Sequence, residues 1–276
     1  RDPIHVEDSK KLEVKPIRLQ RELDLLSAVN LILNLIIGTG IFVTPGSVLA
    51  ESGSVGMSFV VWMLCGFISI LGALVFAELG TLIPASGGIY TFMMAAFSDS
   101  HPFFGPILAY IFVFVQLFMV VPASLAISSQ LFCEYLFKTL VPSASDNENI
   151  LLLKKAVGVC TILVIGIINC YSVKLFVKVQ NLITYLKVFG CSFIIIGGVY
   201  TIISGNALQV PLGFEGTNTS VKAITMSFYG GLYTYDGWNL ITGVTEEIKN
   251  PNKNILRCVL IAVPIVTFLF VVMNAA

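Results

Sequence analysis

Ile36-Ile37-Gly38-Thr39-Gly40-Ile41-Phe42 interrupts one apolar stretch of the chain, and Gly230-Gly231-Leu232-Tyr233-Thr234-Tyr235-Asp236-Gly237-Trp238 interrupts another. A lipid bilayer offers the backbone no hydrogen-bond partners, so a helix that opens at membrane depth needs a cavity, a ligand or a protein wall. Paired interruptions at corresponding positions of two halves are typical of the substrate site of a transporter. We therefore expect these two segments to form a binding site.

The composition places the chain in the membrane. Of its 276 residues, 56% are hydrophobic and only 12% are charged, and the mean hydropathy is +0.90. A soluble domain carries about 25% charged residues. We expect an all-α membrane protein with a cytoplasmic N-terminal tail at 1–22 and a transmembrane domain at 23–276. The net charge of zero argues against a nucleic-acid partner.

About seven segments are long and apolar enough to cross a bilayer, which takes about 20 residues. Pro122 is expected to kink the third of them, since proline removes a helical hydrogen bond, and a polar joint is expected at 84–102. Most lysines and arginines fall on the side of the N-terminus if that end is cytoplasmic, as the positive-inside rule requires. The expected spans lie near 25–49, 56–83, 104–136, 152–172, 179–203, 220–247 and 255–276.

The first interruption has two interpretations. Small residues such as Gly38 and Gly40 let membrane helices pack closely. Alternatively, the two glycines open the helix, and the half-helix that begins at Ile41 presents free N–H groups and a positive dipole end to a carboxylate. We favour ligand binding.

The second interruption contains Asp236, between aromatic residues Tyr233 and Trp238. A carboxylate inside a membrane costs about 2.5–3.5 kcal/mol on insertion scales, which makes it a candidate functional residue. Aspartate is also a good N-cap, here for a half-helix starting near Gly237. The two roles are compatible, and we favour substrate recognition.

Lys187 lies inside the fifth expected span. Its side chain either extends to the membrane surface or is a fixed internal cation beside the first interruption. No metal-ligand spacing, phosphate-binding loop or catalytic triad occurs in the sequence, so we expect no enzyme, no metal and no cofactor. The six cysteines lie in or beside apolar segments, where they are expected to pack as small residues.

Four motifs carry a resemblance to a known family. Together they resemble the light chains of the heteromeric amino-acid transporters, in the amino acid–polyamine–organocation superfamily, and segment 232–238 is most similar to exchangers of cystine and dibasic amino acids. The motifs are Ile37-Gly38-Thr39-Gly40-Ile41-Phe42-Val43-Thr44-Pro45, Phe76-Ala77-Glu78-Leu79-Gly80-Thr81, Tyr235-Asp236-Gly237-Trp238-Asn239 and Val244-Thr245-Glu246-Glu247-Ile248-Lys249-Asn250-Pro251.

The resemblance implies a LeuT-type inverted-repeat fold with helices 1 and 6 broken at the substrate. It implies that the first break holds the substrate carboxylate, the second holds the amine, Tyr233 gates the site and Asp236 faces a cationic side chain. It also implies that Lys187 stands where sodium-coupled relatives hold sodium. The expected substrate-binding residues are Ile37, Gly38, Thr39, Gly40, Ile41, Gly230, Tyr233, Asp236 and Trp238.

The chain departs from the family pattern at Ala144, in its number of spans and at Thr44-Pro45-Gly46, which lacks the family's lysine after the proline. Ala144 takes the place of the cysteine that joins family members to a single-span glycoprotein heavy chain, so a noncovalent pairing is expected if any. Family members have more spans, so we expect a truncated chain that completes a first repeat, about 25–203, and begins a second, about 220–276. Arg1 in place of a methionine agrees with an incomplete chain.

The expected function is sodium-independent exchange of cationic amino acids and cystine against neutral amino acids by alternating access. A neutral or aromatic amino-acid exchanger is the first alternative, in which Asp236 is mainly a cap. A non-transporting, truncated membrane subunit is the second. The expected location is the plasma membrane, among lipids and with the N-terminus in the cytoplasm.

Overall fold

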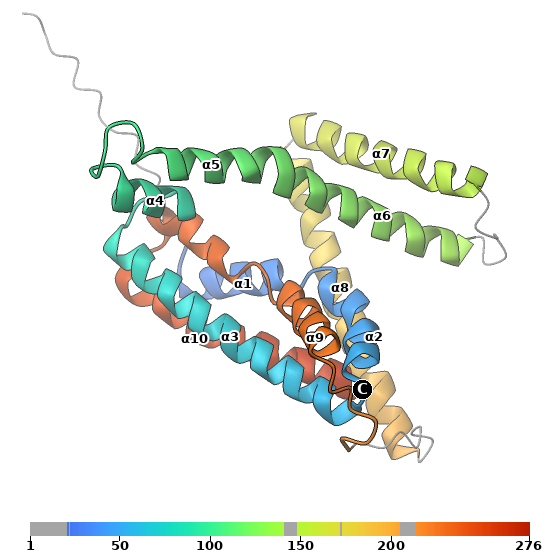
Figure 1. The fold of residues 1–276 in the computed structure, drawn as a ribbon. Coiled ribbons are helices and arrows are strands. Elements are labelled where there is room, and N and C mark those ends of the chain that lie inside the picture. The colour runs from blue at the N-terminus through green and yellow to red at the C-terminus, as the bar shows by residue number, and fades with distance from the viewer. Residues whose placement is uncertain (1–20, 22, 141–147, 172, 205–212) are drawn as a thin grey trace, which may run out of the picture.

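The computed structural model describes residue 21 and residues 23–140, 148–171, 173–204 and 213–276, and these ranges are almost wholly helical. Their regular elements, in chain order (Figure 1), are α1 (Leu25–Ile36), α2 (Gly40–Ser52), α3 (Val55–Leu82), α4 (Ile89–Phe97), α5 (Ile107–Val115), the π-helical turn η1 (Gln116–Val120), α6 (Val121–Leu140), α7 (Glu148–Tyr171), α8 (Val173–Ile203), α9 (Val221–Thr234), the 3-10 helix η2 (Trp238–Glu247) and α10 (Pro251–Ala275).

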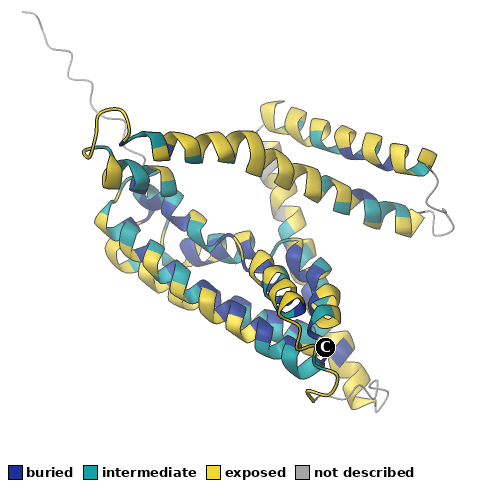
Figure 2. Ribbon diagram, in the orientation of Figure 1, coloured by how far each residue is buried: buried dark blue, intermediate teal, exposed yellow. Residues whose placement is uncertain are grey.

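The helical core is formed by α1, α3 and α10 together with residues of the second interruption. Figure 2 shows that buried residues gather along these helices, while α5, α6 and α7 form a separate and largely exposed layer. Trp62 of α3 is fully buried, and its ring centroid lies 6.2 Å from that of Tyr235 and 5.9 Å from that of Phe270. Such aromatic contacts add to the area that the rings bury.

The first interruption divides one apolar stretch into two helices. Asp24 begins α1 as an N-cap, because its carboxylate accepts the N–H of Ser27 at 2.8 Å. Helix α1 ends at Ile36, helix α2 begins at Gly40, and the two axes differ in direction by 51°.

The second interruption divides the stretch expected as one span at 220–247. Helix α9 ends at Thr234, and the chain turns at Gly237, whose φ of 113° favours a residue without a side chain. The half-helix expected to start near Gly237 is a 3-10 helix that begins at Trp238, with a break in its helical dihedral angles at Val244.

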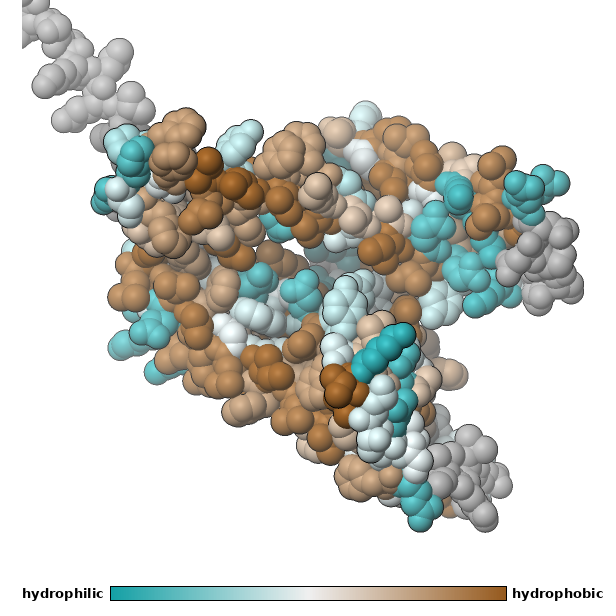
Figure 3. Space-filling view, in the orientation of Figure 1, coloured by the Kyte–Doolittle hydropathy of each residue, from teal (hydrophilic) through white to brown (hydrophobic). Residues whose placement is uncertain are grey.

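Five helices of the described chain are long and apolar enough to cross a membrane, and the bent pair α1–α2 makes a sixth candidate. Six of the expected spans therefore have a counterpart, whereas α9 and η2 do not qualify. Figure 3 shows a mostly hydrophobic surface, with hydrophilic residues at the ends of helices and in the hollow below the α5–α6 layer. A multi-pass helical membrane protein follows from these features.

One detail of the expected topology needs correction. The segment 84–102 was expected to be a polar joint, but it contains α4, a nine-residue helix. The third span accommodates Pro122 with the π-helical turn η1, which lies directly before the helix that carries the proline. A proline lacks the N–H that the preceding turn would use, and a π turn is one way to redistribute those bonds.

Leu23, two residues before α1, pairs with Ile248, the residue after η2. Leu23 donates its N–H to the carbonyl of Glu247 at 2.9 Å and accepts the N–H of Lys249 at 2.8 Å, which forms a single parallel bridge to Ile248. The outer end of α1 is thus fixed to the outer end of η2.

Candidate functional site

The two interruptions lie directly against each other. A Cβ atom added to Gly40 would lie 2.8 Å from the Cα of Thr234, so the backbones of α2 and α9 approach as closely as a glycine allows. A Cβ on Gly237 would lie 3.3 Å from the carbonyl carbon of Leu35. Segments separated by almost two hundred residues in the sequence therefore border one site.

The first interruption presents backbone donors. The N–H of Ile37 bonds to Leu33 at 2.9 Å and that of Gly38 to Ile36 at 2.8 Å. Within the described ranges, no hydrogen bond is formed by the N–H groups of Thr39, Gly40 and Ile41. Three free donors at the start of a helix, together with the positive end of its dipole, suit an anion such as a carboxylate.

The residues of the first interruption differ in burial. Gly40 and Ile41 are buried, Ile37 and Gly38 are half-buried, and Thr39 is exposed. Gly40 packs against Thr234 of α9, so the free donors are attached to backbone whose position is fixed on one side.

The second interruption presents an acidic and an aromatic side chain. Tyr233 is 45% exposed. Asp236 is also exposed, and its carboxylate accepts the N–H of Gly237 at 2.9 Å. Gly237 rather than Asp236 is the N-cap residue of η2, so the aspartate satisfies one donor at the turn while one face of its carboxylate stays accessible.

Trp238 and Gly230 lie at the two ends of this segment. The indole ring of Trp238 packs edge-on against Phe76, with centroids 5.4 Å apart, and close to Gly72 of α3. A Cβ on Gly230 would lie 3.2 Å from a methyl group of Val48 in α2. Trp238 therefore forms part of the packed wall between η2 and α3, and Gly230 belongs to the α2–α9 contact.

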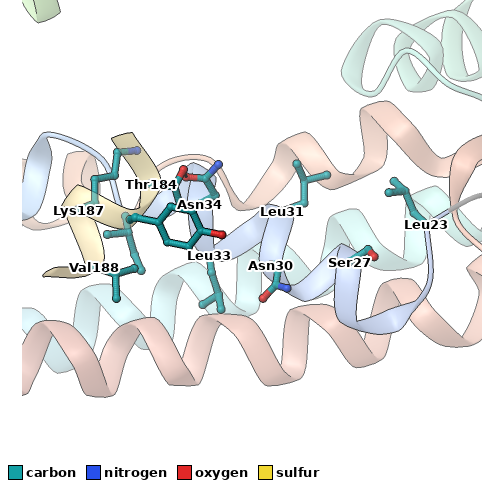
Figure 4. Close-up of a pocket in the computed structure, with 11 residues that line it drawn as sticks. Leu23, Ser27, Asn30, Leu31, Leu33, Asn34, Thr184, Lys187 and Val188 are labelled. Carbon is teal, nitrogen blue, oxygen red and sulfur yellow. Dashed lines mark hydrogen bonds between the residues drawn. The ribbon is translucent and has the colours of Figure 1, made fainter. Parts of the chain in front are cut away.

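Lys187 lies beside the first interruption, in a cavity between α1 and α8. The cavity has a volume of about 550 Å³, and Lys187 and Ile37 both line it (Figure 4). The polar side chains of Asn30, Asn34 and Thr184 also line it, and the Thr184 hydroxyl donates to the Asn34 amide oxygen at 3.2 Å. No ion pair of Lys187 occurs among the described residues.

Two groups of polar residues at the site were not singled out in the sequence. Thr44 and Thr234 form a buried hydroxyl pair across the α2–α9 contact, at 2.6 Å. Asn30 and Asn34 are one helical turn apart on α1 and face the cavity of Lys187. Amides spaced by four residues in an apolar helix are a signal that could have located them.

Among the residues that the structure describes, no three histidine, cysteine, aspartate or glutamate side chains gather as they would to hold a metal ion. The six cysteines are free thiols in this structure. Ala144, at the position of the expected heavy-chain cysteine, lies outside the described residues.

These features define a class of protein: a multi-pass helical membrane protein with two interrupted segments in contact. The model of one protein family, described as amino acid permease, matches residues 23–276. The chain belongs to the amino acid permease family.

Several relatives are similar over most of this chain. The b(0,+)-type amino acid transporter 1 of Mus musculus is 41% identical over 264 residues, covering 96% of this chain and 52% of the relative. The cystine/glutamate transporter of Homo sapiens is 36% identical, with 94% and 50% covered. The large neutral amino acids transporter small subunit 2 of Homo sapiens is 34% identical, with 94% and 47% covered.

The chain therefore spans about half the length of the curated relatives it matches. The resemblance to the light chains of the heteromeric amino-acid transporters is confirmed. The relatives are transporters and not enzymes, in agreement with the expectation of no enzymatic activity. Their names cover different substrates, so the substrate of this chain does not follow from the family alone.

Proposed function

We propose that the protein exchanges amino acids across a membrane by alternating access, without sodium. It would take cationic amino acids and cystine in exchange for neutral amino acids. The observation that carries the proposal is the contact between the two interruptions, with Gly40 against Thr234 and Gly237 against Leu35. One side of this contact supplies free N–H donors and the other an accessible carboxylate.

The same contact supports a LeuT-type fold, in which α1–α2 and α9–η2 are the broken helices 1 and 6. In this proposal the chain from α1 to α8 is the first repeat and the chain from α9 onward begins the second. The substrate carboxylate binds the N–H groups of Thr39, Gly40 and Ile41, and carbonyl groups between Gly230 and Tyr233 bind the amine. A substrate that fits both breaks can shift the equilibrium between two conformations only through its differential affinity for them.

Asp236 would select the side chain, because an accessible carboxylate attracts the cationic end of arginine or lysine. Tyr233, which is on the same segment and nearly half exposed, would cover the bound substrate. Lys187 would supply a positive charge in the cavity that Ile37 also lines, where a bound cation would otherwise be required. A fixed ammonium group there makes exchange independent of sodium.

The remaining features of the proposal concern location and partners. The protein would lie in the plasma membrane with its N-terminus in the cytoplasm. It would pair without a disulfide with a single-span glycoprotein heavy chain, because Ala144 stands at the cysteine position. A neutral or aromatic amino-acid exchanger and a non-transporting membrane subunit are the competing functions.

The substitution Asp236→Asn tests the proposal in cells that express the complete gene product. Exchange of radiolabelled arginine and leucine is measured in parallel, with Asp99→Asn as a matched control, since Asp99 is an exposed carboxylate in a loop outside the site. We expect Asp236→Asn to lower arginine exchange at least tenfold relative to leucine and Asp99→Asn to change neither.

An unchanged arginine preference in Asp236→Asn would support the neutral exchanger instead. Absence of exchange for every amino acid in the unsubstituted protein, with normal surface expression, would support the non-transporting subunit. Replacement of sodium in the medium by choline is expected to leave the exchange rate unchanged, and a sodium requirement would contradict the role of Lys187.

A further inference from the structure

The contact between α2 and α9 contains one polar element. Thr44 and Thr234 are 7% and 3% exposed, and their hydroxyl oxygens lie 2.6 Å apart. The Thr44 hydroxyl also lies 3.0 Å from the carbonyl oxygen of Gly40, and the Thr234 hydroxyl 2.9 Å from that of Gly230. The pair therefore connects the backbone of one interrupted segment to the backbone of the other.

The hydroxyl protons cannot satisfy all of these contacts together. Each threonine hydroxyl donates one proton, so two protons serve three short contacts. Two hydroxyl oxygens 2.6 Å apart repel each other unless one donates to the other. Therefore either Thr234 donates to Thr44 and Thr44 donates to the Gly40 carbonyl, or Thr44 donates to Thr234 and Thr234 donates to the Gly230 carbonyl. The carbonyls of Gly40 and Gly230 thus compete for the same pair of protons.

We infer that the Thr44–Thr234 pair positions the two interrupted segments and couples binding of the substrate amine to binding of its carboxylate. This inference rests on the proposed function. An ammonium group that donates to the Gly230 carbonyl takes the place of the Thr234 hydroxyl. Thr234 then donates to Thr44, and Thr44 donates to the carbonyl of Gly40.

The last of these bonds acts on a donor of the site. The carbonyl of Gly40 and the N–H of Ile41 belong to the same peptide group, and a hydrogen bond accepted by the carbonyl polarises that group. The N–H of Ile41 becomes a stronger donor to the substrate carboxylate. An α-amino acid carries both charged groups. Its binding free energy is therefore more favourable than the sum expected for an ammonium group and a carboxylate that bind independently, whatever its side chain.

The test is a double-substitution cycle in the complete gene product. Thr44→Val, Thr234→Val and the double variant keep the side-chain shape and remove the hydroxyl protons, while Thr44→Ser and Thr234→Ser keep them. Thr225→Val is the matched control, because the Thr225 hydroxyl bonds to the carbonyl of Val221 in the same helix at 2.8 Å and lies on an exposed residue. The half-saturating concentrations of arginine and leucine and the melting temperature of the purified protein are measured for each.

We expect each single valine variant to raise the half-saturating concentration of arginine and leucine by the same factor, about three- to tenfold. The double variant should resemble the single ones, the serine variants should resemble the unsubstituted protein, and Thr225→Val should change nothing. Three outcomes for the half-saturating concentration would refute the pair as a coupling element: additive effects of the two valine substitutions, a different factor for arginine than for leucine, or equal effects of the serine and valine variants. A lower melting temperature of the valine variants with an unchanged half-saturating concentration would refute it as well. An unsubstituted protein that exchanges no amino acid would instead refute the proposed function.

Discussion

Gly40→Ala is the substitution that most directly tests whether the two interrupted segments are in contact. The added Cβ would lie 2.8 Å from the Cα of Thr234 and 3.1 Å from both its methyl carbon and its hydroxyl oxygen. The nearest of these atoms belongs to the backbone, so no side-chain rotation relieves the contact. Helix α9 must move away by about 0.6 Å before the contact reaches 3.4 Å, where ordinary van der Waals distances begin.

The cost follows from this displacement. Overpacking of this kind destabilises proteins by about 1–3 kcal/mol, and the shift also stretches the Thr44–Thr234 hydrogen bond. A loss of about 2 kcal/mol lowers the melting temperature of a domain of this size by about 4–8 °C. Gly46→Ala is the control, since Gly46 belongs to the same helix and a Cβ there meets no atom within 4 Å.

The assay is thermal unfolding of the purified protein in detergent, with each variant measured beside the unsubstituted protein. Gly46→Ala should raise the melting temperature slightly, because alanine is favoured over glycine in a helix by about 1 kcal/mol. Gly40→Ala should lower it. Equal melting temperatures for the two variants would show that α2 and α9 are not in contact at Gly40, and the site built on that contact would have to be abandoned.

Three further predictions follow from other contacts. Gly237→Ala should lower the melting temperature of the protein, because its φ of 113° disfavours any side chain; no loss in a thermal scan would show that the turn after α9 has another conformation. Glu134→Gln should lower the melting temperature, because the Glu134 carboxylate accepts a charge-assisted hydrogen bond from the buried Lys154 ammonium at 2.9 Å. Lys154→Met should then lower it less in the Glu134→Gln background than in the unsubstituted protein, and additive losses in this double-variant cycle would contradict the pairing. Hydrogen bonds from Ser27 lower the pKa of Asp24. The contribution of this cap to helix stability is therefore present above the usual aspartate pKa of about 4 and is lost as the pH falls below it. Asp24→Asn should reduce the change in melting temperature between about pH 6 and pH 3, and a pH profile identical to that of the unsubstituted protein would refute the assignment.

Local sequence predicted much of the helix layout. Long apolar runs located the spanning helices, and the two glycines around Thr39 located the end of α1 and the start of α2. Asp236-Gly237 located the turn after α9, because glycine there permits a positive φ. These features depend on residues within one or two helical turns, which a pattern of residue types can reveal.

Other features depend on contacts that no local pattern contains. Helix α4 has nine residues between glycine and proline, too few to register as a span. The element η2 packs on α3, where Trp238 meets Phe76, and its 3-10 geometry has no counterpart in the local pattern of residue types. Thr44 and Thr234 are 190 positions apart, and neither residue type signals a pairing by itself. The candidate site could be located from sequence, but its hydrogen bonds required the fold.

The bridge between Leu23 and Ile248 turns the two interrupted segments into a closed mechanical linkage. They touch in their middle, at Gly40 and Thr234 and at Gly237 and Leu35, and they are joined at their outer ends by the two backbone hydrogen bonds of Leu23. A rotation of α1 relative to η2 would therefore have to carry η2 along with it or break the two hydrogen bonds of Leu23.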